Sequence, residues 1–341
     1  MLWRWIYNFF AQDIAMDLGT ANTLLYTKRL GLAINEPSVV AWDLKSRQVM
    51  AVGRDAKSYL GRTPQNITTV RPLKEGVIAD FDMTRAMISH FVSKILSQTY
   101  FVKPVLVICI PMGITQVEKK AVIDAAILAG ASQVKLVEEP MAAAIGAGLN
   151  VHAPNGQMVL DIGGGTSEVA VITLDGIAQS QALRIAGDAM TNAVQCYIHD
   201  NLRVTVGENT AEQVKINLGA AVPDFDLPPM EVSGKDVVTG APKVITITPA
   251  HIYEALQVTS RLICDSVLRC LEGTPPELSS DILQNGLLLV GGGSLLHGFD
   301  QLLAKETGLK VTVEKDPLTT VLRGTAKTML DPKNYKQIFI N

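Results

Sequence analysis

The chain has 341 residues, and 48% of them are hydrophobic, enough to form the cores of two large domains. Its net charge of −3 and its 18% charged residues argue against a protein that binds nucleic acid through bulk positive charge. No CxxC pair occurs among the four cysteines, which predicts buried, reduced thiols rather than a zinc site or a disulfide framework; they are Cys109, Cys196, Cys264 and Cys270. The apolar runs are shorter than the roughly 20 residues that cross a bilayer, so no transmembrane helix is expected.

Residues 1–12 are expected to form an amphipathic, membrane-binding segment. The first ten, MLWRWIYNFF, hold five of the eighteen Trp, Tyr and Phe residues. In a helix, Arg4 and Asn8 form a narrow polar face, and such a helix lies in a membrane interface. The apolar face would consist of Leu2, Trp3, Ile6, Phe9 and Phe10. One alternative is a terminus that packs on its own domain or on a neighbouring subunit. A cleaved signal peptide is a weaker alternative, because a strand is expected to start at Ile14.

The first half of the chain alternates strand and helix signals. Thr115 and Glu118 predict a capping box that opens a helix through Ala129, and Pro140 predicts the first turn of an alanine-rich helix. A further helix is expected at 83–98. Strands are expected at 14–18, 23–27, 38–43, 48–52, 105–110 and 134–138.

A polar stretch at 150–156 is typical of a linker, and beyond it the pattern starts again. Strands are expected at 157–162, 168–173, 177–184 and 287–290. The sequence therefore predicts an α/β protein in which one arrangement is built twice.

The most informative repeat consists of two turns, each of which follows an apolar strand. Asp17-Leu18-Gly19-Thr20 and Asp161-Ile162-Gly163-Gly164-Gly165-Thr166 each combine aspartate, glycine and threonine. Glycine allows successive backbone amides to approach a phosphate group closely. The two aspartates are suited to hold hydrated magnesium. One such turn alone could be an ordinary hairpin with an Asx-type turn, whereas two copies favour a nucleotide site.

A third glycine run, Gly291-Gly292-Gly293-Ser294, follows the strand at 287–290 and precedes a helix expected to start near Leu295. This arrangement allows close approach to a nucleotide, and the run could cover the adenine. The chain contains no GxxxxGK[ST] loop and no GxGxxG fingerprint after a strand, so the two commonest nucleotide-binding folds have no support.

The chain resembles the actin, heat-shock chaperone and sugar kinase superfamily, and within it the MreB family. The motifs that carry this resemblance are DLGTANTLLY at 17–26, NEPSVVA at 35–41, RPLKEGVIADFD at 71–82, EEPMAAAIGAGL at 138–149, DIGGGTSEVAVI at 161–172, GENTAEQVKINLGAA at 207–221, GKDVVTGAPK at 234–243 and VGGGSLLHG at 290–298. The resemblance implies an actin-like ATPase fold with two ribonuclease-H-like domains around a nucleotide cleft. Domain I would span 13–149 and about 315–341 with an insert at about 32–70, and domain II would span 150–314 with an insert at about 182–243.

The resemblance also implies the site residues for ATP, for ADP after hydrolysis, and for Mg²⁺. Asp17 and Asp161 would hold the magnesium, mostly through water. Glu139 would orient the attacking water, assisted by Asp161 and Thr166, although a helix-capping carboxylate is the alternative for Glu139. The other nucleotide contacts would be Thr20, Ala21, Asn22, Gly163, Gly164, Gly165, Glu208, Glu212, Lys215, Gly291, Gly292, Gly293 and Ser294. From the residues alone, Glu212 and Lys215 three positions apart on a helix would be read as an ordinary solvent-facing ion pair.

The resemblance finally implies an ATP-dependent bacterial actin that forms antiparallel double filaments on the inner face of the cytoplasmic membrane and organises cell-wall elongation. Tyr100 and Phe101 match a membrane-facing loop in that family, or form an ordinary buried connection. RodZ, MreC and MreD are the expected partners, and no nucleic acid is expected. Rival functions for this fold are a small-molecule kinase and a chaperone-like ATPase. The segment after Asp331 matches no motif.

Overall fold

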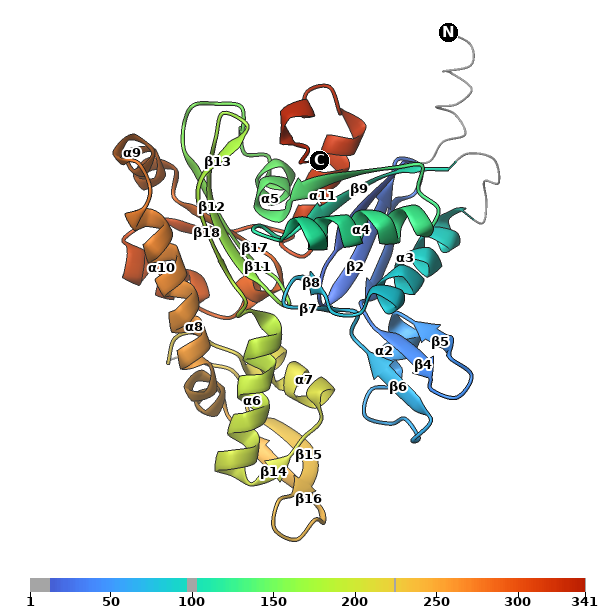
Figure 1. The fold of residues 1–341 in the computed structure, drawn as a ribbon. Coiled ribbons are helices and arrows are strands. Elements are labelled where there is room, and N and C mark those ends of the chain that lie inside the picture. The colour runs from blue at the N-terminus through green and yellow to red at the C-terminus, as the bar shows by residue number, and fades with distance from the viewer. Residues whose placement is uncertain (1–12, 97–102, 224, 341) are drawn as a thin grey trace. The chain divides into compact units, whose positions relative to one another are not determined.

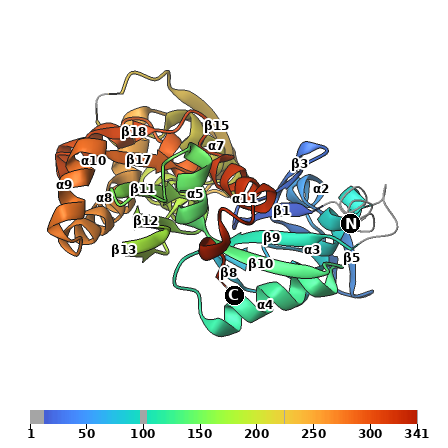
Figure 2. The ribbon, with the colours of Figure 1, turned by 90° about the horizontal axis from the view of Figure 1, so that it is seen from above.

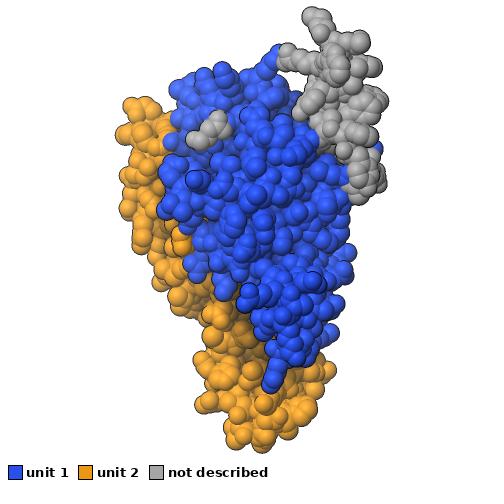
Figure 3. All heavy atoms as spheres, turned by 45° about the vertical axis from the view of Figure 1, so that its right-hand side comes forward, with its two compact units in different colours: residues 1–154, 172–177, 318–341 blue, residues 155–171, 178–317 orange. Residues whose placement is uncertain are grey.

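The computed structural model describes residues 13–96, 103–223 and 225–340. The chain forms two compact units, which Figure 3 shows in different colours. Unit 1 comprises residues 1–154, 172–177 and 318–341, and unit 2 comprises residues 155–171 and 178–317. Each unit contains one five-stranded sheet and one three-stranded sheet.

The five-stranded sheet of unit 1 has alternating side chains that point to two faces, both of them largely buried. In spatial order its strands are β10 (Gln133–Glu138), β9 (Val105–Ile110), β1 (Ile14–Leu18), β2 (Asn22–Thr27) and β3 (Gly31–Pro37). Strand β1 is antiparallel to β2 and parallel to β9. Ile14, Met16 and Leu18 enter the main core of the unit, so Ala15 and Asp17 point to the opposite face.

Helices cover both faces of this sheet (Figures 1 and 2). Helices α3 (Phe81–Leu96) and α4 (Gln116–Leu128) cover the core face, and α5 (Glu139–Ala147) and α11 (Thr320–Leu330) cover the other. The predicted capping box opens α4: the Glu118 amide donates to the Thr115 hydroxyl at 3.2 Å, and the Thr115 amide donates to the Glu118 carboxylate at 2.6 Å. Local sequence therefore fixes the start of this helix.

Helices α5 and α11 cross with their backbones in contact. A Cβ atom at Gly146 would overlap the carbonyl oxygen of Thr320, and a Cβ atom at Gly324 would overlap the carbonyl oxygen of Ala142. The Lys327 ammonium donates to the carbonyl oxygen of Ile145 at 2.8 Å. Only glycine fits at these two positions, because any side chain would push the helices apart.

A smaller sheet of unit 1 consists of β5 (Gln48–Val52), β4 (Val40–Asp43) and β6 (Ile67–Val70), with α2 (Arg54–Ser58) packed beside it. A short hairpin, β7 (Leu73–Lys74) and β8 (Val77–Ile78), follows in the chain. These pieces connect β3 to α3.

The five-stranded sheet of unit 2 repeats the arrangement of the first. In spatial order its strands are β13 (Gly176–Leu183), β12 (Ser167–Thr173), β11 (Gln157–Ile162), β17 (Leu287–Val290) and β18 (Val311–Val313). In both sheets, three strands that are consecutive in the chain are extended by two strands parallel to the first of the three. The duplication expected from the sequence is therefore present in the topology.

The core of unit 2 lies between this sheet and several helices. These are α6 (Gly187–Leu202), α8 (Pro249–Glu272), α9 (Pro276–Asn285) and α10 (Phe299–Thr307). Val194, Ile263 and Phe299 are fully buried in this core. Burying side chains of this size stabilises a fold by about 1.5–3 kcal/mol each.

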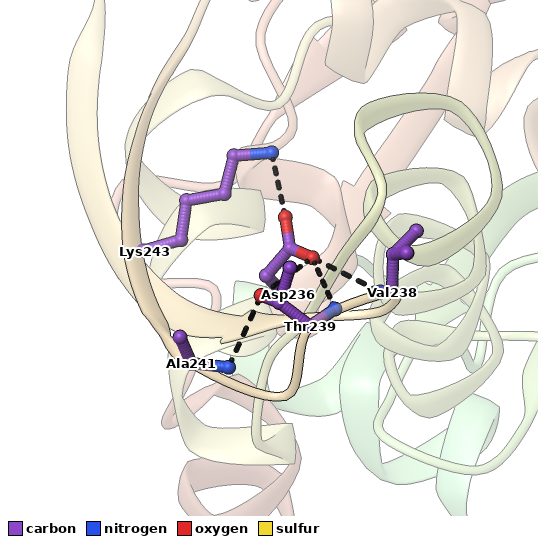
Figure 4. A network of polar contacts seen from close by, with 5 residues as sticks. All are labelled: Asp236, Val238, Thr239, Ala241 and Lys243. Carbon is purple, nitrogen blue, oxygen red and sulfur yellow. Dashed lines mark hydrogen bonds and ion pairs between the residues drawn. The ribbon is translucent and has the colours of Figure 1, made fainter.

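The smaller sheet of unit 2 ends in a hairpin that one aspartate organises (Figure 4). Its strands are β14 (Val204–Thr205), β15 (Met230–Asp236) and β16 (Pro242–Ile247), and α7 (Glu208–Leu218) packs on it. One carboxylate oxygen of Asp236 accepts from the amides of Val238 at 3.0 Å and Thr239 at 2.9 Å. The other accepts from the Lys243 ammonium at 3.0 Å.

The segment after Asp331, which matched no sequence motif, packs on unit 1. The Ile340 amide donates to the Leu136 carbonyl oxygen at 3.0 Å, on strand β10. The Lys135 ammonium lies 4.6 Å from the centroid of the Phe339 ring, and Tyr335 stacks on His152. The segment is therefore attached through both backbone and aromatic contacts.

Two expectations about composition have different outcomes. Cys109, Cys264 and Cys270 are buried thiols, but Cys196 is exposed on α6, so the prediction of buried thiols is wrong for Cys196. Its neighbours one helical turn away, Asn192 and Asp200, are also exposed, which places Cys196 on the polar side of that helix. In the part of the chain that the structure describes, no helix is long and apolar enough to cross a membrane.

Candidate functional site

The candidate site residues of unit 1 gather at one end of its five-stranded sheet. Asp17 is the last residue but one of β1, and the parallel pairing with β9 places Cys109 opposite it. The Cys109 thiol lies 3.3 Å from a carboxylate oxygen of Asp17. Glu139 begins α5, and one donor atom from each of the three side chains lies within 4.8 Å of the others. The fold thus brings Asp17 and Glu139 together, as the predicted roles require.

The first Gly/Thr turn, between β1 and β2, is held by residues distant in sequence. The Ser38 hydroxyl donates to the Gly19 carbonyl oxygen at 2.6 Å, and the Ser38 amide donates to the Ala21 carbonyl oxygen at 3.0 Å. The Thr20 hydroxyl accepts from the Gly76 amide at 3.1 Å. Thr20 is buried, whereas Asn22 is exposed and available to a ligand. Ser38 and Gly76 act as supports of the turn that sequence reasoning did not identify.

The electrostatics of this end of the sheet depend on burial. Burial raises the pKa of Asp17 to about 6, against the opposing effect of the hydrogen bond from Cys109. Burial, together with the negative charges of Asp17 and Glu139, raises the pKa of the Cys109 thiol well above its usual value. The thiol is therefore protonated at neutral pH and acts as a donor.

The two carboxylates of this cluster fit a hydrated magnesium ion. Mg²⁺ prefers oxygen ligands and keeps several of its waters, and the carboxylates of Asp17 and Glu139 supply suitable oxygens. A protonated thiol is a poor ligand for so hard a cation, so Cys109 fits as a hydrogen-bond donor to Asp17 and not as a ligand. Glu138, the neighbouring carboxyl, has its pKa raised by burial, but it is not part of this cluster.

The candidate residues of unit 2 gather around the turn between β11 and β12. Asp161 is buried near the end of β11, and the Gly163 amide donates to the Thr166 carbonyl oxygen at 2.9 Å, which closes the turn. The first residues of α6 lie against this turn: the Gly187 amide donates to the Gly163 carbonyl oxygen at 3.1 Å, and the Asp188 amide donates to that of Gly164 at 2.8 Å.

The orientation of these carbonyl groups fixes the orientation of the amides that follow. In a trans peptide the C=O and N–H groups point in opposite directions. Since the carbonyl groups of Gly163 and Gly164 point to α6, the amides of Gly164 and Gly165 point away from it. Two successive amides directed to the same side form the concave donor arrangement that binds an anion.

Helix α7 connects to the same turn through Lys215. Its ammonium donates to the Gly187 carbonyl oxygen and to the Thr191 hydroxyl, both at 2.8 Å. The Lys215 side chain is thus directed to α6 and not to solvent. Gly187 links Lys215 to the turn, because its carbonyl oxygen accepts from Lys215 and its amide donates to Gly163. Glu212 is half-buried and Glu208 is exposed at the start of α7. Sequence reasoning selected Lys215 but missed Gly187 and Thr191, because nothing in their local sequence marks them.

The structure explains why glycine occupies positions of the third glycine run, which the sequence alone did not show. Gly291 has φ +77°, and a Cβ atom there would overlap the Asp161 carboxylate and the Ile162 carbonyl oxygen. A Cβ atom at Gly293 would overlap the Ile162 side chain. The Ser294 hydroxyl is buried and donates to the Gly291 carbonyl oxygen at 2.7 Å. Glycine is required here so that the run can pack against β11, next to Asp161.

The helix expected near Leu295 starts later than predicted. Residues Gly292–Leu295 form one 3₁₀ turn, and α10 begins at Phe299. Leu296 is extended and Gly298 is left-handed with φ +70°, so the chain cannot continue from the 3₁₀ turn into an α-helix.

The residues predicted for membrane binding lie outside the described residues. They are Leu2, Trp3, Ile6, Phe9, Phe10, Tyr100 and Phe101.

Comparison with known proteins gives a consistent result. A model of the MreB/Mbl protein family matches residues 11–337. The chain is 47% identical to cell shape-determining protein MreB of Escherichia coli (strain K12) over 325 residues, 94% of each chain. It is 46% identical to cell shape-determining protein Mbl of Bacillus subtilis (strain 168) over 322 residues, 94% of this chain and 96% of that one.

Solved structures agree with this result. MreB5 of Spiroplasma citri bound to ADP matches with a TM-score of 0.91 at 34% identity, over 96% of this chain and 98% of that chain. The same protein bound to AMPPNP matches with a TM-score of 0.90.

Proposed function

This chain belongs to the MreB/Mbl family, and we propose that it is an ATP-dependent bacterial actin that forms filaments on the inner face of the cytoplasmic membrane, organises cell-wall elongation and so maintains rod shape. Family membership and the actin-like fold, both expected from the sequence motifs, are confirmed. The relatives in Escherichia coli and Bacillus subtilis are named as cell shape-determining proteins, which supports a cytoskeletal role in cell shape.

We propose ATP and ADP as the ligands. The Spiroplasma citri relative binds ADP and AMPPNP, and this chain matches it over 96% of its length. In unit 1 the turn with Thr20, Ala21 and Asn22 would hold phosphate oxygens. In unit 2 the amides of Gly164 and Gly165 would do the same, each contributing about 1.5–3 kcal/mol as a bond to a charged group.

Slow ATP hydrolysis is the proposed reaction. Glu139 lies beside Asp17 at the start of α5, and its carboxylate would orient the attacking water and accept its proton. Asp17 and Asp161 would hold hydrated magnesium, which neutralises charge on the phosphates when bound. Thr166, at the end of the second turn, would help to place the same water.

The polymer and its partners follow from family resemblance. Repetition of one heterologous contact that does not close produces a filament, and two such filaments would pair antiparallel on the membrane. The aromatic residues of 1–10 would anchor each subunit weakly and the filament firmly. RodZ, MreC and MreD are the proposed partners in cell-wall elongation.

The single observation that carries the proposal is the repeated turn: Asp17 and Asp161 occupy matching places in two sheets of the same topology, each followed by a Gly/Thr turn. The experiment is sedimentation and electron microscopy with ATP, magnesium and lipid vesicles, comparing the full chain, a chain lacking residues 1–10 and Glu139→Ala. We expect membrane-bound filaments from the full chain, weaker vesicle binding after truncation, and filaments without phosphate release from Glu139→Ala.

Two outcomes would contradict the proposal. Phosphorylation of a small acceptor well above basal hydrolysis would indicate a kinase. Stable monomers that bind unfolded peptides in an ATP-dependent manner would indicate a chaperone-like ATPase.

A further inference from the structure

The five-stranded sheet of unit 1 has a second end, opposite to the one that holds Asp17. At this end β1 starts, and Ile14 pairs with Thr27 of β2 and with Leu106 of β9. Val105, the first residue of β9, pairs with Gln133, the first residue of β10. Three strand starts and the connection from β2 to β3 therefore share one end of the sheet.

The connection from β2 to β3 presents cationic and apolar side chains to solvent. Lys28 and Arg29 are exposed, and Leu30 and Leu32 are 48% and 47% exposed. We name these four residues the β2–β3 tip. The Leu30 amide donates to the Thr27 hydroxyl at 3.1 Å, and Gly31 has φ +68°, so the turn has a defined conformation.

Other charged residues lie at the strand starts of this end of the sheet. Lys103, just before β9, is exposed at the same end, and Lys135 lies two residues into β10. Asp13 is the carboxylate that precedes β1; it accepts from the Val105 amide at 3.2 Å, and burial raises its pKa while Lys135 lowers it. Lys135 is three strands away from β2, and its ammonium lies 4.6 Å from the Phe339 ring, so Lys28 and Arg29 are the cationic residues of the tip itself.

The chain itself connects this end to its two aromatic-rich segments. Residues 1–12 join the described chain at Asp13, and residues 97–102 join it at Lys103. The β2–β3 tip combines two exposed leucine side chains with two exposed cationic ones. This combination fits a bilayer that contains anionic lipid, because lysine and arginine bind the headgroups while apolar side chains enter the interface. An acidic protein surface would match the charges but would not require the exposed leucines.

We propose that the β2–β3 tip is a contact site for anionic phospholipid headgroups. Lys28 and Arg29 bind the headgroup phosphates, and Leu30 and Leu32 enter the interfacial layer. This proposal rests on the membrane association proposed above and adds its lipid chemistry. Since a cation near an anionic surface contributes about fivefold to the binding constant, the pair Lys28 and Arg29 contributes about 30-fold, and salt weakens this contribution.

The test is co-sedimentation of the full chain with vesicles of phosphatidylcholine alone and of phosphatidylcholine with about 30% phosphatidylglycerol. Two double variants are compared, Lys28→Gln with Arg29→Gln, and Leu30→Ser with Leu32→Ser. The matched control is Lys305→Gln with Lys310→Gln, which removes the same charge from exposed positions of unit 2. ATP hydrolysis without vesicles is the check that each variant is folded.

The expected result is preferential binding to the anionic vesicles, a loss of about 30-fold in the Lys28/Arg29 variant, a loss on both vesicle types in the Leu30/Leu32 variant, and no change in the control. Wild-type binding by the Lys28/Arg29 variant would overturn this inference and leave the proposed membrane association intact. Equal loss in the Lys305/Lys310 control would show that overall charge matters and not the β2–β3 tip. No binding of the unmodified chain to either vesicle would overturn both proposals, and capture of an acidic protein by the tip without vesicle binding would favour a protein partner.

Discussion

The Cys109 thiol donates a hydrogen bond to Asp17, with 3.3 Å between the sulfur and the carboxylate oxygen. The two residues are 92 positions apart in the chain and are brought together by the parallel pairing of β9 with β1. This thiol restricts the direction in which the Asp17 carboxylate points, so Cys109 is a positioning residue for the proposed magnesium site.

Cys109→Ala should therefore change the response of the protein to magnesium. Without the thiol, the carboxylate loses a bond that contributes about 1 kcal/mol, and we expect half-saturation of hydrolysis at about fivefold more Mg²⁺. The measurement is phosphate release across a magnesium titration, with Cys109→Ser as the variant that restores a donor. Cys270→Ala, in the core of unit 2, should lower the free energy of unfolding and leave the magnesium response unchanged. A Cys109→Ala protein with the wild-type magnesium response would contradict the positioning role.

Asp17→Asn should stabilise the protein when nucleotide and magnesium are absent. The pKa of Asp17 is raised to about 6 in the folded protein. A carboxyl with a raised folded-state pKa favours folding below its unfolded pKa, and this contribution is lost as the pH rises through about 6. In EDTA at about pH 8, Asp17→Asn should increase the free energy of unfolding by up to about 2–3 kcal/mol and reduce its fall between about pH 4 and 6.

Chemical denaturation at several pH values measures this effect. Asp124→Asn, an exposed change on α4, serves as the control and should have little effect. The same Asp17→Asn protein should lose magnesium-dependent hydrolysis. An Asp17→Asn protein that is less stable than the unmodified chain in EDTA at about pH 8 would contradict the prediction that the ionised, buried Asp17 carboxylate destabilises the fold.

Lys215→Met should weaken nucleotide binding by about tenfold, because the ammonium donates two hydrogen bonds that hold α6 against the second glycine turn. Thr191→Val removes one of its two acceptors and should have a smaller effect. Titration with a fluorescent ATP analogue measures both. Lys305→Met, on the exposed surface of α10, is the control. Unchanged affinity in Lys215→Met would mean that α7 does not support the site.

Gly324→Ala should destabilise unit 1 by several kcal/mol, because the new methyl group would overlap the Ala142 carbonyl oxygen and separate α5 from α11. Urea denaturation gives the free energy of unfolding. Gly207→Ala is the matched control, since a Cβ atom there meets nothing within 4 Å and its φ is −73°. Similar stability of the two variants would show that the helices can adjust their crossing.

Asp236→Ala should loosen the β15–β16 hairpin. The amide of Thr239, the Lys243 ammonium and the amide of Val238 hold the pKa of Asp236 well below its usual range. Because this pKa is depressed, its contribution to stability is present at neutral pH and is lost as the pH falls below about 4 towards the folded-state value. Hydrogen exchange of residues 238–241 should accelerate in Asp236→Ala at neutral pH, and less in Asp236→Asn. Asp226→Ala, on an exposed loop, should leave this exchange unchanged.

Local signals predicted many elements but not their long-range partners. The capping box at Thr115 placed α4, and apolar runs placed β1, β9, β11 and β17 with correct bounds. Strand β3 was missed because Leu32 is exposed and only Ile34 is well buried, so its residues do not alternate as a half-buried strand does. The late start of α10 depends on the left-handed conformation of Gly298. The residues next to Gly298 in the sequence do not predict this conformation.

Among the residues of the candidate site, some were identified from the sequence and others were not. Asp17, Asp161 and the glycine turns were found because they repeat in the sequence. Cys109, Ser38 and Thr191 were not assigned roles, because their contacts join residues 15 or more positions apart and arise only from strand register and helix packing. The glycines of the third run were identified, but their packing against β11 could not be foreseen.

Strand β10 lies at an edge of its sheet, and the segment that ends the described chain sits on it through the Ile340 amide and the Phe339 ring. Exposed strand edges attract other strands, which is a common origin of aggregation in proteins kept at high local concentration. A protein that assembles from many copies meets this hazard more often than a monomer does. Because the molecule covers part of β10 with its own chain, that part of the edge is closed to a strand from another molecule.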